Sequence, residues 1–280
     1  MSRNVLTNEL IASIRQLKIT ARPSSLNRRE GLHDSRTHGD SLEFHDFRGY
    51  VPGDDLRRID WNIFQRHRKL ILRQFRHFQN CDACIILDNS ASIHFKPERR
   101  LAALRAAAAI GGTLLNQNDR LELRVGTISV HQYRNGRNAL PEFFEQIEKL
   151  SNTKATPAMP PIPERRRCWV ISDFLEPQGL DFLRKRLENS RPFTPVRIFD
   201  NEDVSPSLRG NLQLTDVETG SSCSVSVDRD VLPGYQAVYR EFLAIIDSFS
   251  SRSRTSHYMI NGDDSPARQL EALFPGGILQ

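Results

Sequence analysis

The sequence contains no long apolar run. Its longest stretch without a charged side chain, residues 106–118, has 13 residues and turns polar at Asn116, whereas a helix that spans a bilayer needs about 20 apolar residues. The first residues also lack the basic region, apolar run and small-residue cleavage site of a secretory signal. We therefore predict a protein with no membrane span and a cytoplasmic location.

Cysteine is scarce, with four residues in 280: Cys81, Cys84, Cys168 and Cys223. The pair Cys81 and Cys84 has the spacing of a redox motif or of half a zinc site. No second close pair supplies the other zinc ligands, and the pair leads into a predicted strand rather than into a helix that would stabilise a thiolate. We therefore predict reduced, partly buried thiols.

Lysine is also rare, since only six of the 39 basic residues are Lys. The basic excess lies in residues 1–80, which carry 15 Lys and Arg against 9 Asp and Glu, a net +6 that leaves −1 for the remainder. Guanidinium groups suit fixed ion pairs or anions. Because acids alternate with arginines in residues 54–60, we favour ion pairing over nucleic-acid contact. The basic and aromatic segment 66–78 keeps a nucleic-acid stacking surface open as an alternative to an edge strand.

Two sections can be separated along the chain. Residues 1–80 are predicted to hold an amphipathic helix, with apolar residues spaced along one face from Leu6 to Leu17, and then a β-rich support segment. In that segment we expect a short helix from Asp54 to Trp61 and a strand over 69–78, with Trp61 contributing buried aromatic area.

Residues 81–280 alternate strands with helices. Continuous apolar runs at 83–87 and 168–172 are typical of strands buried on both faces. This alternation predicts an α/β fold: a Rossmann-like open, mostly parallel sheet with helices on both faces. Residues 211–228 interrupt it with a small β-hairpin insertion.

Polar side chains follow two of these buried strands. Asp88, Ser90 and Ser92 come after the first, and Asp173 comes after the second. Ligands of open parallel sheets bind beyond the carboxyl ends of the strands. Carboxylate and hydroxyl oxygens are hard ligands that suit Mg²⁺ or Mn²⁺, which would retain bound water. We therefore predict a metal site at this edge.

The Asp-x-Ser-x-Ser pattern resembles the metal-ion-dependent adhesion site of von Willebrand factor type A domains. In that family a Thr from a later loop and an Asp ending a further strand complete the site, and the open coordination position accepts a carboxylate from a partner protein. The resemblance implies the last role for Asp173. Thr153 and Thr156 both lie in the interval for the Thr, and we prefer Thr156.

A longer pattern runs through both sections of the chain. Its residues are Gly39, Glu43, Phe44, Arg48, Tyr50, 52–55, Arg57, 59–61, Arg66, Asp173, Phe174, Asp200, Glu202 and 214–220. This pattern resembles the domain-of-unknown-function-58 family. The resemblance implies a von Willebrand type A-like domain that works as an adaptor or chaperone partner of a MoxR-type AAA+ ATPase.

Two function classes compete for the predicted metal site. We expect a non-enzymatic interaction module that binds a partner carboxylate through Mg²⁺. The alternative is a Mg²⁺-dependent phosphoester hydrolase, which needs a nucleophile or general base beside the ion. Asp88 is the available nucleophile and His94 the available base, but no second Asp stands two residues after Asp88. We therefore assign no catalytic residue.

Overall fold

The computed structural model describes residues 5–17, 42–52, 56, 59–77, 82–126, 129–156, 160–164, 166–176, 178–227 and 231–274. They belong to two compact units. The smaller unit lies within residues 21–80, and the larger one combines the residues before 21 with those from 81 onward.

The smaller unit is built on two antiparallel strands, β1 (Leu42–Gly49) and β2 (Ile71–His77). One short helix, α2 (Trp61–His67), precedes β2. This is the β-rich segment that the sequence predicts before the main sheet.

The helix of the smaller unit starts later than predicted. Asp60 caps α2, since its Oδ1 accepts hydrogen bonds from the backbone N–H groups of Asn62 at 3.0 Å and Ile63 at 3.2 Å. Half of the expected helix from Asp54 to Trp61 lies outside the described residues, and Trp61 begins the observed helix instead of ending one. The expectation that Trp61 is buried is wrong, because its side chain is 55% exposed and packs edge-on against Phe64.

In the larger unit the described residues form a six-stranded sheet in the order β10-β7-β6-β3-β4-β5. Neighbouring strands are parallel except for β5, which is antiparallel to β4. The strands are β3 (Asp82–Leu87), β4 (Arg120–Val125), β5 (Ser129–Tyr133), β6 (Arg167–Ser172), β7 (Thr194–Phe199) and β10 (Tyr258–Asn261). The predicted open, mostly parallel sheet is confirmed.

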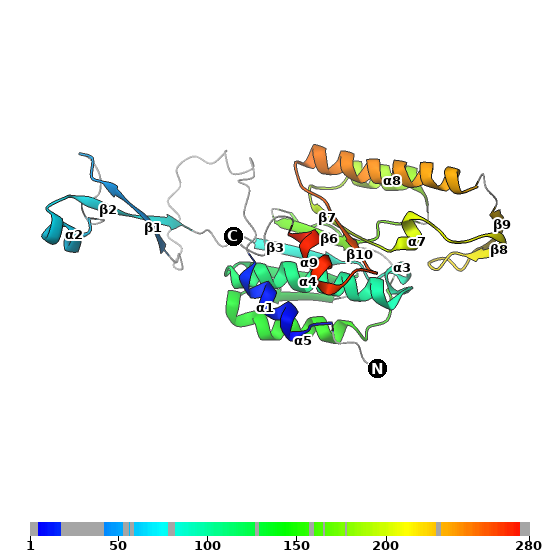
Figure 1. The fold of residues 1–280 in the computed structure, drawn as a ribbon, viewed down its shortest axis with the longest axis horizontal. Coiled ribbons are helices and arrows are strands. Elements are labelled where there is room, and N and C mark those ends of the chain that lie inside the picture. Colours follow the sequence, from blue (N-terminus) through cyan, green and yellow to red (C-terminus); the bar gives the residue numbers. More distant parts are fainter. Residues whose placement is uncertain are drawn as a thin grey trace. The chain divides into compact units, whose positions relative to one another are not determined.

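Helices cover both faces of this sheet (Figure 1). One face is covered by α1 (Asn8–Gln16), α4 (Pro97–Asn116), α5 (Leu140–Leu150) and α9 (Pro266–Leu273), and the other by α6 (Leu180–Glu188) and α8 (Val231–Ser253). Side chains alternate between the faces along each strand. In β3, Ile85 and Leu87 enter the first core, and Cys84 and Ile86 the second. In the part of the chain that is described, no helix is long and apolar enough to traverse a bilayer.

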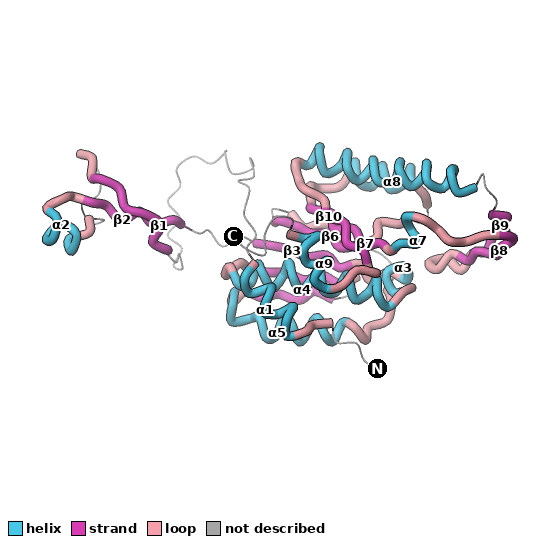
Figure 2. Tube along the Cα trace, viewed as in Figure 1, coloured by secondary structure: helices cyan, strands magenta, loops and turns pink. Residues whose placement is uncertain are grey.

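Short elements complete the unit (Figure 2). They are α3 (Ala91–His94), a 3-10 turn (Gly136–Ala139), α7 (Asn201–Val204) and the antiparallel hairpin of β8 (Gly210–Thr215) and β9 (Ser222–Val227). The hairpin is the predicted insertion.

The N-terminal helix belongs to the larger unit and packs on its sheet. Leu10 and Ile14 of α1 are buried in the core that α4 also lines. The backbone N–H of Leu6 donates to Glu148 Oε1 at 2.7 Å. The sequence analysis groups this helix with residues 1–80. In the structure its apolar face packs in the core of the larger unit.

Two of the three described cysteines are buried free thiols, as predicted. Cys84 and Cys168 are free, buried thiols on paired strands, and Cys223 is free and exposed. Cys81 lies outside the described residues. The prediction of reduced, buried thiols is confirmed for Cys84 and Cys168.

Candidate functional site

The candidate site lies where the order of strands reverses. The chain runs from β3 to β4 on one side and then returns to β6 on the other side of β3. The carboxyl ends of β3 and β6 therefore flank a switch point, the usual place for a ligand in an open α/β sheet. Asp88 follows β3 and Asp173 follows β6, and the N–H of Asp88 donates to Ile171 O at 2.9 Å.

Two neighbours orient the Asp88 carboxylate. Its Oδ1 accepts from the backbone N–H of Ser90 at 2.9 Å, and its Oδ2 accepts from Ser172 Oγ at 2.5 Å. Each carboxylate oxygen keeps a further lone pair. Ser172 is the last residue of β6 and was not singled out from the sequence, where it resembles any small residue closing a strand.

The two predicted serines lie together. Ser90 Oγ and Ser92 Oγ are 3.0 Å apart. Ser90 occupies the N-cap position of α3, yet its hydroxyl makes no capping bond to the helix. The two hydroxyls therefore lie next to each other in the loop that follows Asp88.

Asp173 is the most deeply buried member, at 1% exposure. Its Oδ1 accepts from the N–H of Leu175 at 3.1 Å, whereas its Oδ2 has no hydrogen-bond partner and lies 3.5 Å from a guanidinium nitrogen of Arg99. Burial, followed by the nearby charge of Asp88, raises the pKa of Asp173 to about 7. The next residue, Phe174, has φ +59°, a strained value for a bulky side chain of the kind found at functional sites.

The structure separates the two candidate threonines. Thr156 sits beside the Asp88 loop: its N–H donates to Asn89 O at 2.8 Å, and its Oγ1 accepts from Asn89 Nδ2 at 3.1 Å. The hydroxyl of Thr153 instead donates to Leu150 O, at the end of α5, at 2.8 Å. Asn89 is 3% exposed and positions Thr156 next to the site. The sequence does not identify Asn89 as a site residue, because only its contacts in the fold show this role.

Gly126 provides room for that approach. Its φ is +51°, and a Cβ at this position would come within 2.3 Å of Thr156 Oγ1. A residue with a side chain here would displace Thr156.

His94 is held by the same asparagine. Its Nε2 lies 2.9 Å from Asn89 Oδ1. Burial and the charge of Arg100 lower the pKa of His94 to about 4. At neutral pH it is an uncharged imidazole with one nitrogen already engaged.

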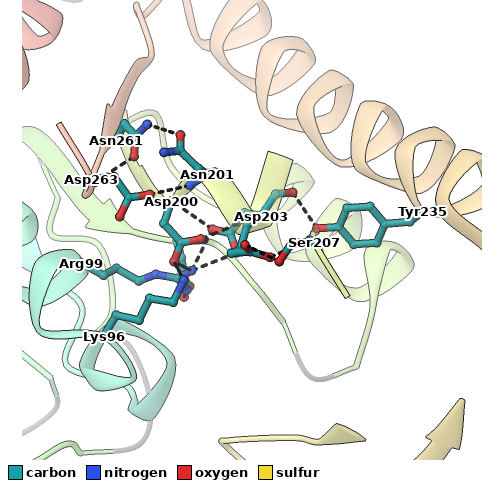
Figure 3. A network of polar contacts seen from close by, with 11 residues as sticks. Lys96, Arg99, Asp200, Asn201, Asp203, Ser207, Tyr235, Asn261 and Asp263 are labelled. Carbon is teal, nitrogen blue, oxygen red and sulfur yellow. Dashed lines mark hydrogen bonds and ion pairs between the residues drawn. The ribbon is translucent and has the colours of Figure 1, made fainter. Parts of the chain in front are cut away.

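A buried ion network adjoins the site (Figure 3). Arg99 of α4 is 5% exposed, and its Nη2 donates to Asp200 Oδ2 at 2.7 Å and to Asp203 at 2.9 Å. Lys96 Nζ also contacts Asp200, at 2.9 Å. Asp200 caps α7 by accepting from the Asp203 N–H. This network links the start of α4 to the residues that follow β7.

One carboxylate reaches the site from the hairpin. The backbone N–H of Ser92 donates to Oε1 of Glu218, in the turn between β8 and β9, at 2.6 Å. The two residues are 126 positions apart, so no local pattern in the sequence could have paired them.

The oxygen set suits a hard divalent cation. Two carboxylates and two hydroxyls, with the unpartnered Oδ2 of Asp173 among them, are ligands of the type that Mg²⁺ or Mn²⁺ takes together with water. Among the described residues no group of three or more His, Cys, Asp or Glu side chains is close enough to hold a metal. A cation here would therefore depend on the serine hydroxyls and on water.

Two relatives of this chain are named as uncharacterized proteins. The chain is 28% identical over 242 residues to "Uncharacterized protein Rv1480" of Mycobacterium tuberculosis and to "Uncharacterized protein Mb1516" of Mycobacterium bovis, a match that covers 79% of this chain and 74% of each relative.

Solved structures give weaker likenesses. One is "conserved hypothetical protein BatB" from Bacteroides thetaiotaomicron, at 12% identity and TM-score 0.32, covering 68% of this chain and 93% of that one. Another is an "aerotolerance-related membrane protein" from Bacteroides fragilis, at 15% identity and TM-score 0.32, covering 69% and 96%. At these TM-scores neither bears on the geometry of the site.

The family is established by a direct sequence match. The model of the family described as "Protein of unknown function DUF58" matches residues 46–242, which include the Asp88 loop, Asp173, the ion network at Asp200 and the hairpin turn. The chain belongs to the DUF58 family.

Proposed function

We propose that this protein is a non-enzymatic, metal-dependent protein-interaction module. Asp88, Ser90, Ser92 and Asp173 would hold a Mg²⁺ or Mn²⁺ ion, with Thr156 as the further candidate. The ion would supply an electrophilic position for a carboxylate of a partner protein. These side chains would hold the ion, and the two carboxylates would balance its charge.

The observation that carries the proposal is the Oδ2 atom of Asp173. A buried carboxylate oxygen with no hydrogen bond is costly to maintain, and this one lies beside a second carboxylate and two serine hydroxyls. Arg99, with a guanidinium nitrogen 3.5 Å from this oxygen, compensates part of the charge. A divalent cation would compensate the charge that remains on the two carboxylates.

Two features favour binding over hydrolysis. His94, the available base, has a pKa lowered to about 4, so it is a weak proton acceptor. Asp88 has both oxygens oriented by Ser90 and Ser172, which suits a fixed ligand better than a nucleophile.

The partner that the family resemblance implies is a MoxR-type AAA+ ATPase. In this proposal an exposed Asp or Glu of the ATPase meets the cation, and the module couples ATP-driven remodelling to a target.

Calorimetric titration with Mn²⁺ and Mg²⁺ tests the cation site. We expect binding to the wild type and at least a tenfold weaker affinity for Asp88→Ala. Asp181→Ala is the matched control, because that side chain is 89% exposed and lies on α6, outside the site. Equal affinities of wild type and Asp88→Ala would refute the proposed site.

Binding to the ATPase tests the partner. Purified MoxR-type ATPase should bind the wild type in Mg²⁺, and both EDTA and Asp88→Ala should abolish binding. An interaction insensitive to both changes would rule out the metal-bridged mechanism. Purified protein that cleaves generic phosphoesters with Mg²⁺, but not after Asp88→Ala, would favour the hydrolase instead.

A further inference from the structure

Three segments of the smaller unit meet at one end of its β1–β2 hairpin. Gly49, the last residue of β1, pairs with Ile71, the first residue of β2. The N–H of Tyr50 donates to Leu70 O at 3.0 Å, and the N–H of Asp60 donates to Ile71 O at 2.9 Å. These bonds hold the residues after β1, the start of α2 and the residues before β2 at the same end of the hairpin (Figure 1).

Large apolar side chains are exposed at this end. Helix α2 has no buried residue, and the side chains of Trp61 and Leu70 are 55% and 40% exposed. In the segment that joins β1 to α2, Val51 is 58% and Leu56 is 56% exposed. A surface that gathers several exposed apolar side chains marks an interaction site more often than a free surface. The smaller unit does not bury these side chains within itself.

Cationic side chains adjoin the apolar ones. Arg66, Arg68 and Lys69 are all exposed, and residues 61–70 contain no Asp or Glu. In the described part of the chain none of the three forms an ion pair, although the Arg68 guanidinium lies 6.0 Å from the centre of the Phe64 ring. The exposed arginine Arg184 of the larger unit, in contrast, pairs with a carboxylate. The charges beside α2 are therefore available to an anionic partner.

Exposed apolar side chains beside unpaired cations fit the surface of an anionic membrane. Apolar side chains can enter the boundary between lipid head groups and acyl chains while Lys and Arg contact the acidic head groups. Trp is the residue type most typical of this boundary. The combination on the smaller unit matches both requirements, and it needs no membrane-spanning helix.

Single-stranded nucleic acid, the partner class that the sequence leaves open, fits less well. Bases stack on aromatic rings, whereas Val51, Leu56 and Leu70 are aliphatic. Phe64 is partly buried, and the Trp61 ring already packs edge-on against it with the centroids 5.9 Å apart. Successive bases need several open rings, and among the side chains described in this unit Trp61 is the ring that is more than half exposed.

We propose that this end of the smaller unit is a peripheral binding surface for anionic phospholipid membranes. Trp61 and its aliphatic neighbours enter the head-group boundary, and the cations of residues 66–69 contact lipid phosphates. The inference goes beyond the proposed cation site and contains none of its residues, so either proposal can fail without the other.

Trp61 itself reports the binding. The chain has two tryptophans, and Trp169 is 5% exposed in the core of the larger unit. In EDTA, vesicles of equal parts phosphatidylglycerol and phosphatidylcholine should shift the tryptophan emission of the whole chain to shorter wavelengths. They should also bind it at least tenfold more tightly than vesicles of phosphatidylcholine alone. Trp61→Phe should abolish the shift.

Neutralised variants test the surface. Arg66→Gln combined with Lys69→Gln should weaken binding to the anionic vesicles at least tenfold in co-sedimentation. Arg68 is left in place because it ends α2 with φ +54°. Lys185→Gln combined with Arg209→Gln removes the same charge at exposed positions of the larger unit and should match wild type. Equal binding by the two double variants would overturn the assignment of the surface.

A single-stranded oligothymidylate tests the competing partner. An oligonucleotide that binds and quenches Trp61, with vesicles that leave its emission unshifted, would overturn the lipid proposal and assign the surface to nucleic acid. Wild-type protein that sediments with neither type of vesicle would also overturn it. Equal affinity for neutral and anionic vesicles would show that the cations take no part, which contradicts the proposal as stated.

Discussion

Asp173 and Asp200 follow the neighbouring strands β6 and β7 of one sheet, and each is 1% exposed. Both lie near Arg99, which approaches Asp173 to 3.5 Å and Asp200 to 2.7 Å. Their electrostatic environments nevertheless differ. The pKa of Asp173 is raised to about 7 by burial and by Asp88. Burial also acts to raise the pKa of Asp200, but hydrogen bonds from Lys96 and Arg99 outweigh it and leave that pKa lowered.

The difference distinguishes a structural carboxylate from a candidate ligand. Asp200 accepts from two cationic side chains and from a backbone N–H, so its charge is compensated within the chain. Asp173 has one backbone bond and a buried oxygen without a hydrogen bond. Depth of burial alone would have assigned the two residues the same role.

Removal of Arg99 is expected to have the largest effect. Arg99→Met would leave Asp200 buried with Lys96 as its remaining cation and Asp203 without its guanidinium. Breaking a buried ion pair from one side typically costs about 3–5 kcal/mol. Urea unfolding monitored by circular dichroism should show this loss.

The matched control for that change is Arg184→Met. Arg184 pairs with Glu241 at the surface, where both side chains are about half exposed, and such pairs contribute roughly 0–1 kcal/mol. Equal losses in the two variants would show that the Arg99 network is no better protected from water than a surface pair.

Asp200→Asn and Asp173→Asn compare the two aspartates directly. In the absence of metal, Asp200→Asn should lower the free energy of unfolding by about 1–3 kcal/mol, because the buried guanidinium of Arg99 and the partly exposed ammonium of Lys96 lose their charged acceptor. Asp173→Asn should cost less, because the amide removes a buried charge that only the 3.5 Å contact with Arg99 compensates, and its oxygen can still accept from Leu175. A larger loss for Asp173→Asn would contradict the distinction between the two residues.

The sheet, and the aspartates that follow β3 and β6, could be predicted because short stretches of sequence indicate them. The run at 83–87 is apolar at every position, as a doubly covered strand requires, and Asp88 follows it immediately. The strand at 129–133 was missed because it is a short edge strand whose alternation includes His131 and Gln132. Nothing in its composition separates it from a loop.

The contacts that complete the site are long-range and could not be predicted. Arg99 lies in a helix whose sequence does not show that this side chain points inward to Asp200, 101 residues away. Glu218 reaches Ser92 across 126 residues. Residue types suggested the candidate ligands, but only the fold shows which residues lie near one another.

The pH dependence of stability sharpens the comparison at Asp200. A folded pKa below the usual 3.8 means that the folded state holds this proton less tightly than the unfolded state. The stabilisation is therefore complete above pH 3.8 and is lost as pH falls through the folded pKa. The difference in free energy of unfolding between wild type and Asp200→Asn should be constant near neutral pH and shrink below pH 4. A difference independent of pH down to pH 2 would mean that the ionised carboxylate does not contribute.

The smallest expected effect concerns the outer edge of the same network. Tyr235, at the start of α8, donates its hydroxyl to Asp203 O at 2.6 Å and is 37% exposed. Tyr235→Phe keeps the ring and removes this bond, which should cost about 0.5–1 kcal/mol in urea unfolding, because water can partly replace a half-exposed partner. Combined with Asp200→Asn, the two losses should fall short of additivity if α7 transmits one change to the other. Strict additivity would mean that the ion network consists of Lys96, Arg99, Asp200 and Asp203 alone, and that Tyr235 of α8 is not coupled to it.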